Sequence, residues 1–115
     1  MDIKINDNIY KTKLVITGKD IQKGMMGRKF DNTFDGMLFL MKDGPQSFWM
    51  KNCITNLDII FIDKGNITKI HHNCKPCNSD DCENFEGNGD MALELRGGEC
   101  KKYGIKEGDS IDIQS

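Results

Sequence analysis

The stretch between residues 48 and 63 places polar side chains within strongly apolar runs. Two apolar, β-rich runs, residues 48–50 and 57–63, flank a polar corner at residues 51–56 that is rich in amides. This pattern predicts two central strands joined by the corner. Trp49, the single tryptophan, belongs to the first of them.

Alternation within the second run places a carboxylate among isoleucines. Successive side chains of a strand point to opposite faces, so Asp58 shares its face with Ile60 and Ile62. A buried carboxylate is costly unless it is paired or hydrogen-bonded. We therefore expect Asp58 to have a cationic or amide partner, to lie at a cleft, or to titrate abnormally.

The remaining patterns predict short strands, tight turns and one helix. Thr17 has the character of an N-cap, and apolar residues spaced i, i+4 after it predict a helix of about ten residues that ends near Gly27. Residues 42–45 predict a strong turn, and residues 73–89 a long irregular loop. Further strands are expected at residues 3–5, 10–16, 37–41, 67–71, 91–95 and 110–113.

These elements predict one domain over residues 1–115, mainly β, with about eight short strands and one short α-helix. A compact barrel-like or sandwich arrangement is expected because either hides most strand edges.

The net charge and the lengths of the apolar runs limit the classes of partner that we expect for this chain. The net charge of −2 gives no general attraction to phosphate backbones, so we expect no nucleic-acid partner. No apolar run approaches the roughly 20 residues of a membrane-spanning helix, so we expect no membrane partner either. No apolar targeting segment follows Met1, which predicts a cytoplasmic protein as written, and an exported one if a signal segment has been removed.

Polar side chains that interrupt apolar strands, together with cations beside them, form the first candidate site. Asp58 and Glu94 each break an apolar strand, and Arg28 is one of only two arginines. We predict a cleft in which a carboxylate pairs with Arg28 and Trp49 forms an apolar wall. The residues of this site are Arg28, Trp49, Lys51, Asn52, Asp58 and Glu94.

Three roles are open for these residues. They could bind a small polar, glycan-like ligand with the indole stacked on a sugar or ring. Asp58 and Glu94 could form the acid/base pair of a hydrolase if they face one another. Alternatively, a buried ion pair could fix strand register, with Trp49 in the core.

The second candidate site is a cysteine-containing stretch in the expected loop. His72, Cys74, Cys77 and Cys82 offer the ligands of a Cys3His zinc site, although the second close cysteine pair of a typical site is missing. Free thiols, a disulfide and a redox-active dithiol are the other possibilities.

Several sequence blocks resemble one uncharacterised family. The blocks are residues 24–28, 36–39, 48–52, 57–63, 76–77 with Cys82, 92–95 and 105–109. Together they are similar to domain of unknown function family 192, also known as uncharacterised protein family 0127, over roughly residues 14–113.

The resemblance implies a small, mainly β domain of unsettled function, and many members of the family carry an export signal. Its pattern contains Pro76, Cys77 and Cys82 but usually not Cys74 or the histidines, which favours a Cys77–Cys82 pair. Our hypothesis is a non-enzymatic binding or accessory module; the alternatives are a hydrolase using Asp58 and Glu94, and a metal or thiol redox protein.

Overall fold

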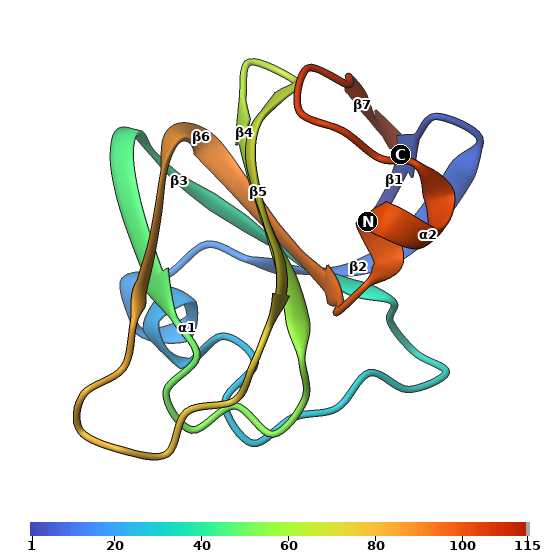
Figure 1. Ribbon diagram of the computed structural model, residues 1–115. Helices are drawn as coiled ribbons and strands as arrows, with labels where there is room; N and C mark the ends of the chain where they lie inside the picture. The colour runs from blue at the N-terminus through green and yellow to red at the C-terminus, as the bar shows by residue number, and fades with distance from the viewer. Residues whose placement is uncertain (115) are drawn as a thin grey trace.

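The computed structural model describes residues 1–114. Within them, seven strands form one curled sheet, and two short helices lie at its margins (Figure 1). The elements in chain order are β1 (Asp2–Ile5), β2 (Asn8–Val15), α1 (Gly18–Lys23), β3 (Gly36–Trp49), β4 (Leu57–Asp63), β5 (Asn66–Cys74), β6 (Asn84–Arg96), α2 (Glu99–Tyr103) and β7 (Ile111–Gln114). The predicted class, a mainly β barrel-like domain, is confirmed.

The sheet has the strand order β5-β4-β6-β3-β2-β1-β7. All pairs are antiparallel except β2 with β3, which run parallel because α1 and its flanking segments cross between them. β3 and β4, the strands on either side of the polar corner, are not neighbours, since β6 lies between them.

The prediction of a turn at residues 42–45 is wrong. β3 continues through this stretch as one strand, and a register shift between Leu40 and Gly44 bends it while it stays paired with β6. The runs at residues 37–41 and 48–50, expected as separate strands, are therefore two halves of β3. This explains why there are seven strands and not eight.

The irregular loop predicted at residues 73–89 is also too long. β5 extends to Cys74 and β6 begins at Asn84, so the irregular part shrinks to residues 75–83. The glycines of β6 allow it to pack closely against β4. A Cβ at Gly89, which has φ +153°, would clash with the Ile62 carbonyl oxygen.

The helix start at Thr17 is confirmed, because its side chain accepts a hydrogen bond of 3.2 Å from the Asp20 amide. The predicted length of about ten residues is wrong, because α1 ends at Lys23 and Gly24, which follows it, has a positive φ. No helix in residues 1–114 is long and apolar enough to cross a membrane.

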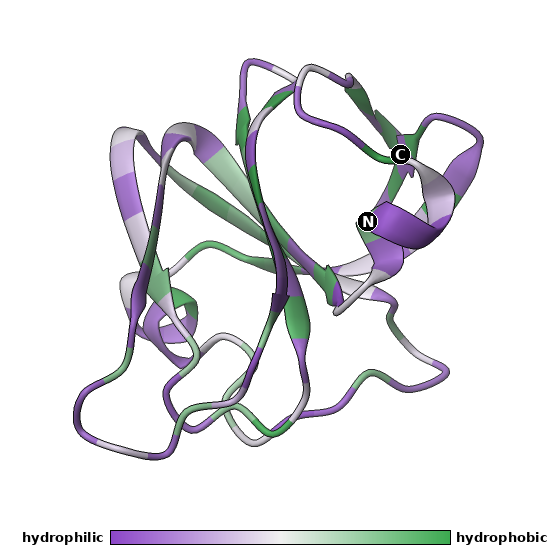
Figure 2. Cartoon of the chain, in the orientation of Figure 1, coloured by the Kyte–Doolittle hydropathy of each residue, from purple (hydrophilic) through white to green (hydrophobic). Residues whose placement is uncertain are grey.

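Hydrophobic residues follow the central strands of the sheet (Figure 2). The buried ones form two cores, one on each face. In β4 the predicted alternation is confirmed: Ile60 and Ile62 belong to the first core, and Leu57, Ile59 and Phe61 to the second. The first core also includes Cys100 of α2. The second core includes Met25 and Phe34 from the segment that follows α1, and Phe48 of β3 and Phe85 of β6 pack against it.

Candidate functional site

Asp58 is fully buried in β4 and is saturated by backbone donors. Its Oδ1 accepts hydrogen bonds from the amides of Asn73 (2.8 Å) and Gly98 (3.0 Å), and its Oδ2 accepts one from the amide of Cys100 (2.8 Å). Gly98 is the N-cap of α2 and has no side-chain oxygen to offer, so Asp58 supplies the missing acceptor from another strand. Asp58 thus has its predicted amide partners, and they join β4, β5 and α2.

Glu94 lies on the opposite face of the sheet from Asp58. In the β4–β6 ladder Asp58 is paired with Leu95, whereas Glu94 is paired with Ile59. Directly paired residues share a face and neighbours along a strand do not. The predicted acid/base pair is therefore not formed, because the sheet itself separates the two carboxylates.

Beside Glu94 is a pocket of about 410 Å³. It lies between α1, with the residues that follow it, and the strands β3 and β6. Trp49 lies at this pocket and is 40% exposed, and Phe39, Phe48 and Met25 line it with apolar surface. Its polar contributors are Gln22, Lys23, Ser47, Cys53, Asn84 and Glu94. The structure thus brings together Trp49 and Glu94, two of the six predicted residues.

Glu94 itself is 4% exposed, and its Oε1 makes no hydrogen bond with any residue in the described range 1–114. Burial raises the pKa of this carboxyl from 4.5 to about 8, so the uncharged acid predominates at pH 7. Most buried polar atoms in proteins have a partner, and an unpaired one calls for an explanation.

Arg28 and Asn52, two of the other predicted site residues, do not line the pocket. The Arg28 guanidinium lies 5.5 Å from the centre of the Phe34 ring, and Arg28 is in neither of the two ion pairs found among residues 1–114. The pairing of Arg28 with a buried carboxylate is therefore a wrong prediction. Asn52, with φ +60°, shapes the corner: its carbonyl accepts from Gly27, and its amide donates to Cys77.

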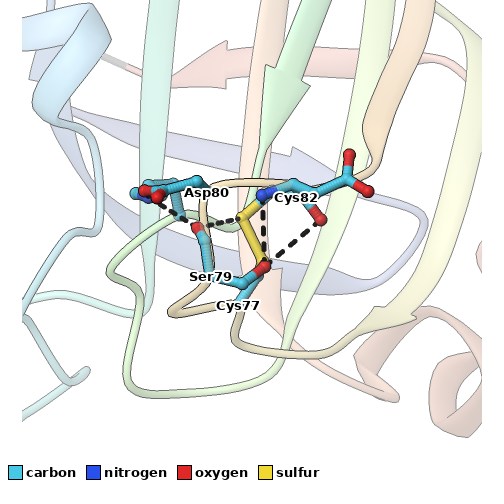
Figure 3. Close-up of a disulfide and its surroundings, with 6 residues drawn as sticks. Cys77, Ser79, Asp80 and Cys82 are labelled. Carbon is cyan, nitrogen blue, oxygen red and sulfur yellow. Dashed lines mark hydrogen bonds and ion pairs between the residues drawn. A yellow bond between two sulfur atoms is a disulfide. The ribbon is translucent and has the colours of Figure 1, made fainter.

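Lys51 faces the segment 75–83 and not the pocket. Its Nζ donates to the Ser79 carbonyl (2.5 Å) and lies 3.0 Å from Asp80 Oδ1. Figure 3 shows these partners beside a disulfide between Cys77 and Cys82. The Cys77 amide also donates to the Met50 carbonyl, so the bridged segment is attached to the corner that follows Trp49.

The four residues proposed for zinc are not brought together. Cys77 and Cys82 are bonded to each other, and Cys74 is a buried free thiol whose Sγ donates to the His71 carbonyl. Among residues 1–114 no three His, Cys, Asp or Glu side chains are placed to hold a metal ion. The structure thus has the disulfide, one of the arrangements that the sequence left open.

Cys53 is a pocket residue that the sequence does not single out. It is 8% exposed and lines the pocket beside Glu94, and burial together with the Glu94 charge raises the pKa of its thiol to about 12. The sequence does not single out Phe39 and Phe48 as pocket residues either. Their convergence depends on the bend in β3 between Leu40 and Gly44, where the sequence predicts a turn and not a bent, continuous strand.

Comparisons with known proteins identify relatives but no activity. A family model described as uncharacterized ACR, DUF192, matches residues 1–113. A solved protein of unknown function from Novosphingobium aromaticivorans DSM 12444 is 28% identical, with a TM-score of 0.87 over 97% of this chain and 84% of that one. No curated protein matches the sequence.

A second solved structure, from Sinorhizobium meliloti 1021, is provisionally described as a transcription regulator. It is 28% identical, with a TM-score of 0.82 over 96% of this chain and 89% of that one.

Proposed function

Since the chain belongs to the DUF192 family of uncharacterized proteins, whose name carries no activity, we propose its function from the pocket beside Glu94. The protein is a non-enzymatic binding module for a small ligand. The ligand places a polar group at Glu94 and an apolar or ring-shaped body against Trp49. The observation that carries this proposal is the buried, unpartnered Oε1 of Glu94 beside an open pocket.

The dimensions and lining of the pocket support this role. Small-molecule sites commonly have volumes of roughly 300–1,000 Å³, mostly apolar walls and a few placed polar groups. The pocket here has about 410 Å³, with Trp49, Phe48 and Phe39 among its apolar residues. A ligand hydrogen bond to Glu94 would satisfy the atom that the protein leaves unpaired.

A hydrolase with two carboxylates is less well supported. Glycoside hydrolysis commonly uses two carboxyl groups that flank the scissile bond. Asp58 lies on the other face of the sheet and accepts three amide hydrogen bonds there, so Glu94 would have to act without it.

Thiol redox chemistry centred on Cys74, Cys77 and Cys82 has weak support as well. Burial raises the pKa of the Cys74 thiol to about 12, which leaves little of the reactive thiolate at pH 7. The description of the Sinorhizobium structure suggests nucleic acid as a partner. A net charge of −2 argues against binding to phosphate backbones.

A ligand-observed NMR screen tests the binding role. We would screen aromatic, amine and monosaccharide fragments against the full chain, Trp49→Ala and the control Tyr103→Ala, which removes an exposed aromatic ring from α2. We expect fragments that bind the wild-type chain and Tyr103→Ala, and whose affinity falls about tenfold in Trp49→Ala. The absence of any such fragment, or equal binding to all three proteins, would contradict the proposal.

A further inference from the structure

Within residues 1–114, Glu94 has no positively charged partner. The ion pairs within residues 1–114 are Lys51–Asp80 and Arg96–Asp35, and neither includes Glu94. Lys23 is the cationic residue that lines the pocket, and it is exposed at the surface of α1. A ligand that enters the pocket can therefore supply the cation that the protein does not.

The walls beside Glu94 suit a cation better than an anion. Three aromatic side chains line the pocket: Phe39, Phe48 and Trp49. The Phe39 and Phe48 rings pack edge to face with centroids 5.0 Å apart. Aromatic faces attract ammonium groups through their quadrupole, and the attraction strengthens where water is excluded. An anion would meet the same rings and a carboxyl that becomes negative when it ionises.

From this combination we propose that the ligand of the pocket is a small organic amine. Its ammonium group contacts the carboxylate of Glu94, and its apolar body lies between α1 and the aromatic side chains. This inference rests on the proposed binding function and specifies the chemical class of its ligand.

The charge of Glu94 makes amine binding dependent on pH. The other titratable groups nearby are the Cys53 and Cys74 thiols, whose pKa values burial raises to about 12, and Lys23 at the pocket edge. The thiols stay neutral between pH 6 and pH 8, where Glu94, with a pKa of about 8, gains charge. An ammonium binds the ionised form, so amine affinity rises with pH over this range, by about tenfold or more.

The test is a matched series of three probes: phenethylamine, which is cationic, 2-phenylethanol, which is neutral, and phenylacetate, which is anionic. Dissociation constants would be measured by protein-observed NMR on the full chain at pH 6 and pH 8. The variant Glu94→Gln keeps the shape of the side chain and removes its charge. Glu86→Gln, at an exposed position of β6, is the matched control.

We expect phenethylamine to bind most tightly, with an affinity that rises about tenfold or more from pH 6 to pH 8. That rise should vanish in Glu94→Gln and persist in Glu86→Gln. If 2-phenylethanol binds as tightly as the amine at both pH values, the amine inference fails while the binding function stands. If no probe binds, the amine inference fails. The wild-type pH series decides the question even if Glu94→Gln does not fold.

Discussion

Asp58 and Glu94 are acidic residues inside apolar strands, and their surroundings give them different properties. Three backbone amides converge on Asp58, whereas Oε1 of Glu94 has no partner among the described residues. Hydrogen bonds from amides stabilise a carboxylate, and burial without them favours the neutral acid. Asp58 therefore ties β4 to β5 and α2, whereas Glu94 is the residue that we propose to contact a ligand.

Replacing Asp58 with Asn should destabilise the protein without changing the pocket. The amide keeps the size of the side chain, but its NH₂ group cannot accept the bonds that one oxygen now accepts, and the charge is lost. We expect the free energy of unfolding to fall by roughly 2–4 kcal/mol in chemical denaturation. Asp81→Asn, at an exposed position, should change it by less than about 0.5 kcal/mol. A similar small loss in both variants would contradict the role assigned to Asp58.

Glu94 should make stability depend on pH in the direction opposite to that of a salt-bridged acid. Its folded pKa of about 8 lies above the ordinary value of 4.5, so between these values the folded state binds more protons than the unfolded state. Stability therefore falls as pH rises through this range, by roughly 1 kcal/mol per pH unit.

The measurement is urea denaturation of the wild-type chain and Glu94→Gln at pH 5.5 and pH 7.5. The stability of the wild type relative to the variant should fall by about 2 kcal/mol between the two pH values. A constant difference would mean that the Glu94 carboxyl is not perturbed by burial.

At the scale of the elements, the sequence predicted the central strands well. Both of their faces are apolar, and polar turn residues bound each apolar run. Leu57–Asp63 was expected at its observed bounds, and its alternation correctly divided the two cores. The outer halves of β3 and β6 were missed because glycines and Pro45 indicate turns locally. Here a bulge and long-range pairing outweigh that preference.

The candidate site was harder to predict than the strands. Alternation along one strand cannot say which face of β4 matches which face of β6. A one-residue difference in register decides whether Asp58 and Glu94 face each other. Trp49 and Glu94 each stand out within their own strand, and the structure places both at one pocket, but their proximity follows from the bend in β3.

The disulfide segment is the element whose removal is simplest to test. Cys77 and Cys82 close a short loop whose backbone is hydrogen-bonded to Met50 and Asn52, next to Trp49. Closing such a loop restricts the unfolded chain, so Cys77→Ser with Cys82→Ser should lower the free energy of unfolding by about 2 kcal/mol. Chemical denaturation with and without reductant measures this.

Reductant should destabilise the wild-type chain by the same amount and leave the double variant unchanged. An equal effect of reductant on both proteins would show that the bridge does not contribute.

At the scale of the whole molecule, the sheet separates Asp58 from the pocket that we propose as the binding site. Asp58, α2 and the first core lie on one face, and Glu94, α1 and the pocket lie on the other. A ligand bound in this pocket would therefore act on Glu94 without disturbing the hydrogen bonds of Asp58. This separation predicts that stability and binding respond to different substitutions.

The most direct test follows the Glu94 carboxyl carbon by NMR in protein labelled with ¹³C-glutamate. In the free chain we predict a carboxyl that titrates near pH 8 and is protonated at pH 7. Saturating phenethylamine at pH 7 should ionise it, because an ammonium beside the carboxylate lowers its pKa. A carboxyl that titrates near its ordinary value of 4.5 in the free chain, or that stays protonated in the presence of the amine, would contradict the account.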